Sequence, residues 1–215
     1  MFDLTADVPL HNLQGQVVGP KGLRTRLRLI ETLESLVQSC PLRELRVMDI
    51  CREARTAPGT FYLYFKDVQD LALEAIRIYQ KLPPELDELL NQEWPRSEAL
   101  ALSRRFVNDY ACYWDAHFHL LQVRNLTADE GDARMIELRY ACLVPVLERL
   151  ADKIAPGQRA AMPHPMAAAT VVMASLERMA SVLRLIPAQR EDITRHQVIE
   201  AQAWVLANLM GYSQE

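Results

Sequence analysis

Residues 49–67 form the stretch DICREARTAPGTFYLYFKD, whose side chains could bind a polyanion. Pro58 suits the first position of a helix, where its missing N–H costs nothing, and Phe61 and Phe65 are spaced to turn toward a core. The polar side chains of this helix carry hydroxyl, phenol and ammonium groups and are predicted to face outward: Thr60, Tyr62, Tyr64 and Lys66. Such groups suit the phosphates and base edges of a DNA major groove.

The charge distribution gives the same interpretation weak support. Residues 20–66 hold nine Lys or Arg and five Asp or Glu, although the whole chain has a net charge of −4. One end of the molecule is therefore basic, which would let that end face nucleic acid. A solvated helical surface would produce the same count, so this alternative stays open.

Helical periodicity surrounds the motif. Apolar residues of the segment 21–39 recur at intervals of three and four, which predicts one helix with a buried stripe. Three more helices are predicted directly after it, over residues 47–54, 58–65 and 67–82. The two short ones indicate a helix-turn-helix unit, in which the small side chain of Ala54 lets the helices approach closely. The first 19 residues lack apolar periodicity, and we expect a flexible arm there.

The motif carries a resemblance to a known family. DICREA followed by APGTFYLYFKD, behind a basic first helix, closely resembles the DNA-binding region of the TetR family of bacterial transcriptional regulators. The resemblance is specific over about residues 20–80 and weakens to helix number and placement beyond them. It implies an all-α homodimer with an N-terminal DNA-binding domain and a C-terminal domain for effector binding and dimerisation. It also implies repression that a small molecule relieves.

The resemblance further implies which residues contact DNA. The start of the recognition helix, which faces base edges, corresponds to Ala57, Pro58, Gly59 and Thr60. The resemblance places further DNA contacts, mainly to backbone phosphates, on three helices: Lys21, Arg24, Arg46, Met48, Tyr62, Tyr64 and Lys66.

Four residues depart from the family's pattern. Arg55 stands where a turn glycine is usual, Thr56 where an apolar residue is common, Ala57 where a Ser caps the helix, and Val68 where a Lys often follows. A non-glycine left-handed turn and a missing cap hydroxyl each cost about 1 kcal/mol, so the turn is expected to be less rigid. Val68 cannot bind a phosphate. Arg55 either reaches a phosphate in its place or is a solvated turn residue.

The middle of the chain predicts two further helices. A short segment over residues 85–94 follows the break at Pro83-Pro84 and leads to a long helix over residues 97–123. Thr127 and Glu130 have the spacing of a capping box, which predicts that a new helix begins there. That helix is expected to run to Ile154, with a kink at Pro145 and an end at Pro156-Gly157.

One face of the long helix is the candidate effector site. Its residues mix apolar bulk with groups that can orient a ligand: Phe106, Tyr110, Tyr113, His117 and Arg124. In a helical domain such a stripe is first of all core, and this alternative stays open. His117 and His119 project to nearly opposite sides of one helix, so they cannot hold one metal ion together.

The last two predicted helices are candidates for a subunit interface. They span residues 165–186 and 191–210, with Pro187 between them and Gly211 as a left-handed cap. Both are apolar on more than one face, so we expect them to form a four-helix bundle across a two-fold axis, with Met173 and Leu206 at the contact. The alternative is a helix buried on all sides inside the monomer.

Composition and missing motifs exclude several classes. A chain of 215 residues with 50% hydrophobic and 24% charged residues can bury a core, so a disordered protein is excluded. The sequence contains no Gly-rich phosphate loop, no G-x-S-x-G and no H-E-x-x-H, so we expect no enzyme, catalytic residue or cofactor. The spacing of Cys40, Cys51, Cys112 and Cys142 fits no zinc site, which predicts reduced core cysteines and no metal.

The same reasoning predicts a cytoplasmic protein. The N-terminal segment has no basic stretch typical of a signal peptide, and the most apolar run, residues 165–176, is shorter than the roughly 20 residues of a membrane span. We therefore expect no membrane partner.

Together these observations predict an all-α regulator with four parts. They are a flexible arm over residues 1–19, a helix-turn-helix domain over 20–66, a connecting helix over 67–82, and an effector-binding and dimerisation domain over 83–215. The expected function is a homodimeric repressor that binds an inverted-repeat DNA operator and is released by a small apolar or amphipathic ligand. The alternatives are an activator, a regulator without an effector, or a helical ligand-binding module without operator affinity.

Overall fold

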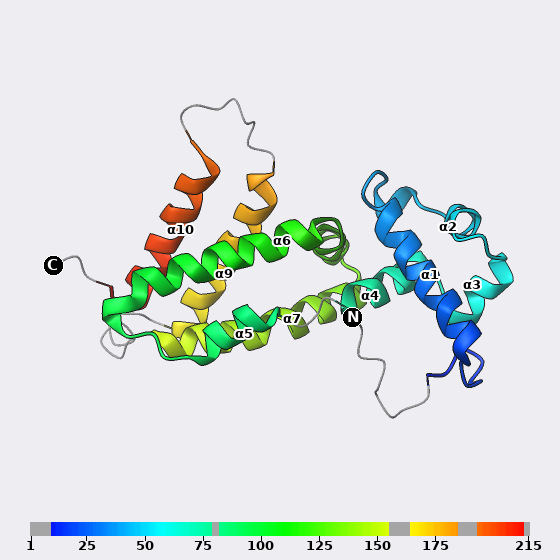
Figure 1. Ribbon diagram of the computed structural model, residues 1–215, viewed down its shortest axis with the longest axis horizontal. Coiled ribbons are helices and arrows are strands. Elements are labelled where there is room, and N and C mark those ends of the chain that lie inside the picture. Colours follow the sequence, from blue (N-terminus) through cyan, green and yellow to red (C-terminus); the bar gives the residue numbers. More distant parts are fainter. Residues whose placement is uncertain (1–9, 79–81, 155–163, 185–192, 213–215) are drawn as a thin grey trace. The chain divides into compact units, whose positions relative to one another are not determined.

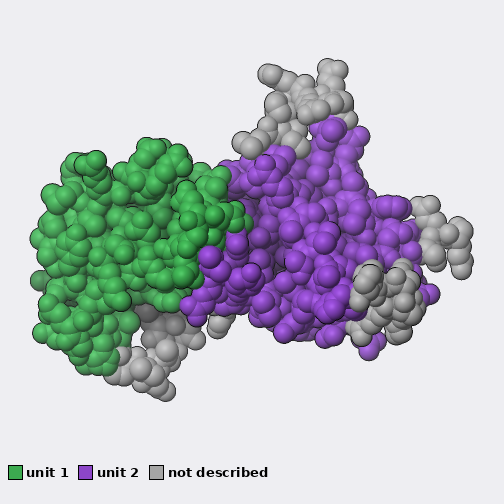
Figure 2. All heavy atoms as spheres, turned by 180° about the vertical axis from the view of Figure 1, so that it is seen from behind, with its two compact units in different colours: residues 1–79, 119–135 green, residues 80–118, 136–215 purple. Residues whose placement is uncertain are grey.

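The computed structural model describes residues 10–78, 82–154, 164–184 and 193–212 (Figure 1). All regular elements in these ranges are helices, and the only β-type pairing among them is a single bridge between His11 and Val17. The predicted all-α class is confirmed for this part of the chain. The chain divides into two compact units, shown in different colours in Figure 2. Unit 1 contains residues 1–79 and 119–135, and unit 2 contains residues 80–118 and 136–215.

Unit 1 contains the predicted helix-turn-helix. Its first four helices are α1 (Pro20–Leu36), α2 (Val47–Glu53), α3 (Pro58–Tyr64) and α4 (Val68–Ile78), with a short 3-10 helix at Leu42–Glu44. Helix α1 packs against the other three, and α2 packs against α3. The largest side chains buried in this unit come from all four helices: Leu29, Leu33, Ile50, Phe61, Phe65, Leu71 and Ile76. Phe61 and Phe65 therefore face inward as predicted.

The turn between α2 and α3 has a left-handed residue at the predicted position. Arg55 has a φ of 50°. The N–H of Thr56 donates to the carbonyl of Cys51 (2.9 Å) and the N–H of Arg55 to that of Arg52 (3.2 Å), which is the Schellman pattern that usually ends on glycine. Ala57 precedes α3 and provides no side-chain cap. The turn thus lacks both of the stabilising features that the sequence comparison noted.

Unit 2 contains the remaining helices. They are α5 (Pro84–Asn91), most of α6 (Ala99–Asp129), most of α7 (Ala133–Lys153), α9 (Pro165–Leu183) and α10 (Arg195–Leu209), with a 3-10 helix at Arg96–Glu98. Helices α9 and α10 pack against each other. Ion pairs link distant segments, such as Arg149 to Asp87 (2.6 Å) and Arg104 to Glu200 (2.7 Å). Buried Trp94, Phe106 and Trp114 occupy the interior.

The boundary between α6 and α7 differs from the prediction. Helix α6 continues through Thr127, so the expected capping box at Thr127 and Glu130 is wrong. Gly131, with a φ of 95°, ends α6, and the carbonyl of Thr127 accepts the N–H of Asp132 (3.1 Å). Asp132 then caps α7, because its Oδ1 accepts the N–H groups of Arg134 (3.0 Å) and Met135 (3.2 Å).

Helix α6 is also not continuous. His117 has non-helical dihedral angles (φ −120°, ψ 18°), so the predicted single helix is interrupted there. Helix α7, in contrast, continues through Pro145 to Lys153. A capping box is present at the start of α10, where the Thr194 side chain accepts the N–H of Gln197 and the Gln197 side chain accepts the N–H of Thr194.

Some predicted boundaries lie outside the described residues, namely Pro156-Gly157, Pro187 and the helix start at residue 191. Residues 79–81, near the predicted end of the connecting helix at residue 82, also lie outside them. Gly211 is left-handed as predicted, with a φ of 84°. The four cysteines are free, but the prediction that all are core residues is wrong. Cys51 is buried, and burial raises the pKa of its thiol, whereas Cys112 is exposed.

Candidate nucleic-acid interface

Unit 1 contains all the residues that the sequence predicts to contact DNA. Lys21 and Arg24 are exposed on the first turns of α1, and Arg46 and Met48 are exposed at the start of α2. On α3 and just after it, Ala57, Gly59, Tyr62 and Lys66 are exposed, and Pro58, Thr60 and Tyr64 are half-buried. The fold therefore leaves every one of these side chains at least partly accessible.

The cations of unit 1 fall into two groups. Arg26 and Arg77 both pair with Glu74, and Arg52 pairs with Asp49 (2.8 Å), so these cations are engaged within the unit. The four predicted DNA-binding cations make no ion pair within the described ranges: Lys21, Arg24, Arg46 and Lys66. Charges of this second group remain available for phosphates.

The two departures next to α3 have different surroundings. Val68 is buried in the first turn of α4, so this position does not present a side chain to a ligand. Arg55 is exposed in the left-handed turn. Its side chain is thus accessible, whereas that of Val68 is part of the core.

Tyr64 also has a structural role that sequence reasoning missed. A Cβ on Gly22 would lie 2.8 Å from the Tyr64 hydroxyl and 2.9 Å from a methyl carbon of Val18. Gly22 therefore permits close packing of α1 against the end of α3 and against the segment that precedes α1. A glycine in the first turn of a basic helix was the only sequence signal of this contact.

The segment before α1 is a second feature that the sequence did not predict. Residues 1–9 lie outside the described part, and residues 10–18 of the expected arm form a short turn. The N–H of Leu13 donates to the carbonyl of Leu63 on α3 (2.9 Å). The turn is therefore attached directly to the predicted recognition helix.

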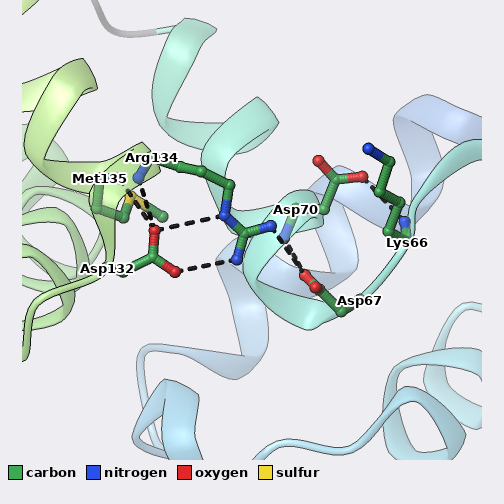
Figure 3. A network of polar contacts seen from close by, with 6 residues as sticks. All are labelled: Lys66, Asp67, Asp70, Asp132, Arg134 and Met135. Atoms are coloured by element: carbon green, nitrogen blue, oxygen red, sulfur yellow. Dashed lines mark hydrogen bonds and ion pairs between the residues drawn. The ribbon is translucent and has the colours of Figure 1, made fainter.

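A polar network connects the start of α4 with the start of α7 (Figure 3). Asp67 caps α4 by accepting the N–H of Asp70 (2.6 Å), and Asp70 in turn accepts the N–H of Lys66 (2.9 Å). Arg134 lies between Asp67 (3.6 Å) and Asp132 (3.0 Å). The hydrogen bond from Arg134 lowers the pKa of the Asp132 carboxyl, and the same bond raises the pKa of Arg134. The network fixes the backbone on which Lys66 is carried.

The candidate effector residues are only partly brought together. Phe106, Tyr110, Tyr113 and His117 form a row of rings in unit 2, with successive centroids 6.0, 6.0 and 5.3 Å apart. Burial lowers the pKa of His117. Arg124 belongs to unit 1, where it is buried and its Nε donates to Asn125 (3.0 Å).

Cavities occur in both units. In unit 2 a cavity of about 280 Å³ lies beside Tyr113, Arg105, Asp109 and Leu86. In unit 1 a cavity of about 420 Å³ lies between the end of α1 and the last turns of α6. Two interior donors of α6, Ser103 Oγ and Trp114 Nε1, have no hydrogen-bond partner among the described residues. Within the described ranges no group of three His, Cys, Asp or Glu residues could hold a metal ion.

Comparison with known proteins identifies the chain. A model of the tetracyclin repressor-like C-terminal domain matches residues 86–203, which is more than half of the chain. A search of curated proteins found no match to this chain. Helix α9 is long and apolar enough to cross a membrane by length and composition, but it lies inside the matched domain and is a core helix of that domain.

Solved structures share the fold at low sequence identity. The fatty acid degradation regulator FadR from Bacillus halodurans is 15% identical, with a TM-score of 0.58 over 91% of this chain and 96% of that chain. The MbdR regulator from Azoarcus sp. CIB is 18% identical, with a TM-score of 0.63 over 86% and 98%. A proposed transcriptional regulator from Saccharomonospora viridis, solved in complex with choline, is 18% identical, with a TM-score of 0.62 over 89% and 97%. The domain match and the shared fold together show that this chain belongs to the TetR family of transcriptional regulators, which are not enzymes.

Proposed function

We propose that the protein is a homodimeric repressor that binds an inverted-repeat operator in the cytoplasm and is released by a small apolar or amphipathic molecule. The observation that carries this proposal is the outer surface of unit 1. There α3 exposes Tyr62 and is followed by exposed Lys66, while Lys21, Arg24 and Arg46 keep their charges free of ion pairs within the described ranges.

Each element has a separate task at the operator. The start of α3 is small and accessible at Ala57, Gly59 and Thr60, so its backbone can approach base edges closely. The cations and the two tyrosines then hold the helix in register by binding phosphates, which adds affinity on any sequence. Base contacts give the specificity, and phosphate contacts give most of the affinity.

The effector site is proposed for unit 2, beside Tyr110, Tyr113 and His117. A buried hydrogen-bond donor without a partner costs about 1–3 kcal/mol, so Ser103 and Trp114 favour a ligand that brings acceptor atoms to them. Both residues lie on the same face of α6 as Tyr110, because their separations of seven and four positions correspond to about two turns and one turn. The choline bound to the S. viridis regulator shows that a member of this fold takes a small molecule.

The subunit interface is proposed for the exposed faces of α9 and α10. Val171 is 69% exposed and Trp204 and Val205 are 51% and 44% exposed, although all three are large and apolar. Val171 lies in line with exposed Ala167 and Ala174. Met173 and Leu206 are buried inside unit 2, so they are core residues and not the contact residues that the sequence analysis expected.

Coupling would use the two helices that contribute to both units. Helix α6 passes from unit 2 into unit 1 next to its break at His117, and α7 passes from unit 1 into unit 2 just after Met135. A ligand shifts the protein away from its DNA-binding state only by its differential affinity for the two states, typically about 1–3 kcal/mol. We propose that this difference reaches α4 and Lys66 through the first turn of α7.

The test of DNA binding compares Tyr62→Ala and Lys66→Ala with Arg96→Ala, which removes an exposed cation from unit 2. Removing Lys66 should weaken binding to many sequences and reduce the slope of log affinity against log salt by about 2, because the dimer loses one lysine from each subunit. Arg96→Ala should leave that slope unchanged. Circular dichroism checks that all three variants stay folded. If Tyr62→Ala and Lys66→Ala both bind DNA with wild-type affinity, these residues do not contact DNA.

The effector arm of the proposal has its own test. A ligand found by thermal-shift screening of the wild-type protein should release it from DNA. Tyr113→Ala should reduce that release while leaving ligand-free DNA binding intact, because Tyr113 belongs to unit 2 and not to the DNA-binding surface. Normal release of the variant by the same ligand would place the effector site elsewhere.

A further inference from the structure

Residues 10–18 form a turn that its own hydrogen bonds hold in shape. The side-chain oxygen of Asn12 accepts the N–H groups of Gln14 (3.0 Å) and Gln16 (2.9 Å), and the Asn12 amide donates to the Gln16 side chain (3.0 Å). The N–H of Val18 donates to the carbonyl of Leu10 (2.8 Å) and closes the turn. Gly15 provides the left-handed residue, with a φ of 77°. A closed turn of this kind presents its exposed side chains in a fixed arrangement.

This turn is attached to the end of the recognition helix. The carbonyl of Leu63 is one of the last carbonyls of α3, which have no partner inside the helix, and it accepts the N–H of Leu13 (2.9 Å). Val18 and Tyr64 also approach the same side of Gly22. The turn therefore lies beside the C-terminal end of α3 and the first turn of α1.

The exposed surface of the turn suits DNA. No acidic residue occurs between positions 10 and 30, whereas Lys21 and Arg24 follow directly. Gln14 is exposed, and its side-chain amide makes no hydrogen bond within the described ranges, whereas the Gln16 amide is used inside the turn. Leu13 and Val17 are 48% and 64% exposed, so the turn also leaves apolar surface without a partner. Amide donors bind phosphate oxygens, and apolar side chains can pack on deoxyribose.

We propose that residues 10–18 are a second DNA-contacting element, which binds the sugar–phosphate backbone next to the base pairs read by α3. Gln14 donates its amide hydrogens to a phosphate, and Leu13 and Val17 pack on the adjoining sugars. The turn adds contacts outside the helix-turn-helix and at the same time caps α3. This inference rests on the proposed function, because it needs an operator for α3.

The test uses a charge series at Gln14 in the full chain, with the operator obtained by selecting DNA fragments that the wild-type protein binds. Gln14→Ala should weaken binding by about tenfold or more, as expected for the loss of a hydrogen bond to a charged group. Gln14→Glu should weaken it further, and Gln14→Lys should restore binding and raise the salt slope by about 2, because each subunit of the dimer gains one lysine. A structural role alone would not order the variants by charge.

The matched control is Gln38, an exposed glutamine just beyond the opposite end of α1. The same three substitutions at Gln38 should change affinity less than twofold. Hydroxyl-radical footprinting adds a second measurement. Gln14→Ala should lose protection at the outer sugars of each half-site and keep protection at its centre, where α3 binds.

Two results would overturn the inference, and they are distinguishable. If the wild-type protein binds the operator and the Gln14 series gives the same affinities and footprint as wild type, the turn does not contact DNA and the proposed function stands. If the wild-type protein selects no DNA at all, the proposed function and the role of the turn both fail.

Discussion

Nη1 of Arg134 lies 3.6 Å from Oδ1 of Asp67 within unit 1. Asp67 is the N-terminal cap of α4 and directly follows Lys66, while Arg134 stands in the first turn of α7. Because the later residues of α7 belong to unit 2, this pair is a point where a shift of α7 would change the environment of the α4 cap. Both side chains are partly exposed, so the pair can form and break at modest cost.

A double-mutant cycle should measure this pair. Asp67→Asn keeps a capping side chain but removes the charge, and Arg134→Gln removes the cation. We expect a coupling free energy of about 0.2–1 kcal/mol from urea unfolding of the two single variants and the double variant, as for other exposed pairs. Strictly additive effects would show that the two side chains do not interact in solution.

Asp132 should make stability depend on pH. Its pKa is lowered in the folded protein, so its contribution is complete above the unfolded pKa of about 4 and is lost as pH falls through the lower folded value. At pH 7 Asp132→Ala should cost about 1 kcal/mol because it removes the cap of α7, and Asp132→Asn should cost less because asparagine also caps. Denaturant unfolding at pH 7 and pH 3 checks both values. The difference between wild type and Asp132→Asn should shrink at pH 3, and an unchanged difference would contradict the role of the carboxylate.

Two substitutions in the turn before the recognition helix should increase the stability of the protein. Arg55 has a φ of 50°, which glycine adopts without steric penalty, so Arg55→Gly should stabilise the protein by about 1 kcal/mol. Ala57→Ser should add a cap to α3 and stabilise by a similar amount. Both are measured by thermal or urea unfolding. If Arg55→Gly instead lowers stability, the Arg55 side chain contributes a compensating interaction in the folded state.

Charged substitutions should separate the subunit interface from the core. Val171→Asp and Trp204→Glu change exposed residues, so they should give folded monomers by light scattering and circular dichroism. Met173→Asp places an unpaired charge in the core, so it should lower the free energy of unfolding by several kcal/mol and unfold the protein. If both surface variants remain folded dimers, α9 and α10 do not form the subunit interface.

The sequence predicted the helix-turn-helix well because its signals are local. Pro58 marks the start of α3, and the spacing of Phe61 and Phe65 marks its buried side, so the bounds of α2 and α3 agree with prediction to within one residue. The left-handed turn at Arg55 was also predicted, because Arg55 stands where the TetR family usually has a turn glycine. Which of these residues contact DNA stays a prediction.

Features that depend on competing local signals were missed. Thr127 has the spacing of a helix cap, but Gly131 and Asp132 form a stop and a cap only a few residues later, and they determine where α6 ends. The break at His117 has no proline or glycine to announce it. The attachment of residues 10–18 to α3 joins backbone atoms 50 positions apart, Leu13 N and Leu63 O, and no side-chain pattern records such a bond.

The burial of α9 could not be read from composition alone. Residues 165–183 are apolar on several faces, so the sequence could not separate the face toward the core from the face toward a second subunit. Packing separates them, because Met173 and Leu176 are buried while Val171 is exposed. The same limit applies to Arg124. Its helical spacing from His117 predicted that it belongs to the candidate effector site, but it is buried in unit 1.

The most direct measurement of the central claim is a selection of genomic DNA fragments by the purified wild-type protein, with Lys66→Ala as a parallel sample. We predict enrichment of one inverted repeat, with half-site centres about 34–36 Å apart or at a multiple of that spacing. Lys66→Ala should enrich the same sequence with lower yield. Fragments without two-fold symmetry, or no enrichment over bulk DNA at low salt, would contradict the account.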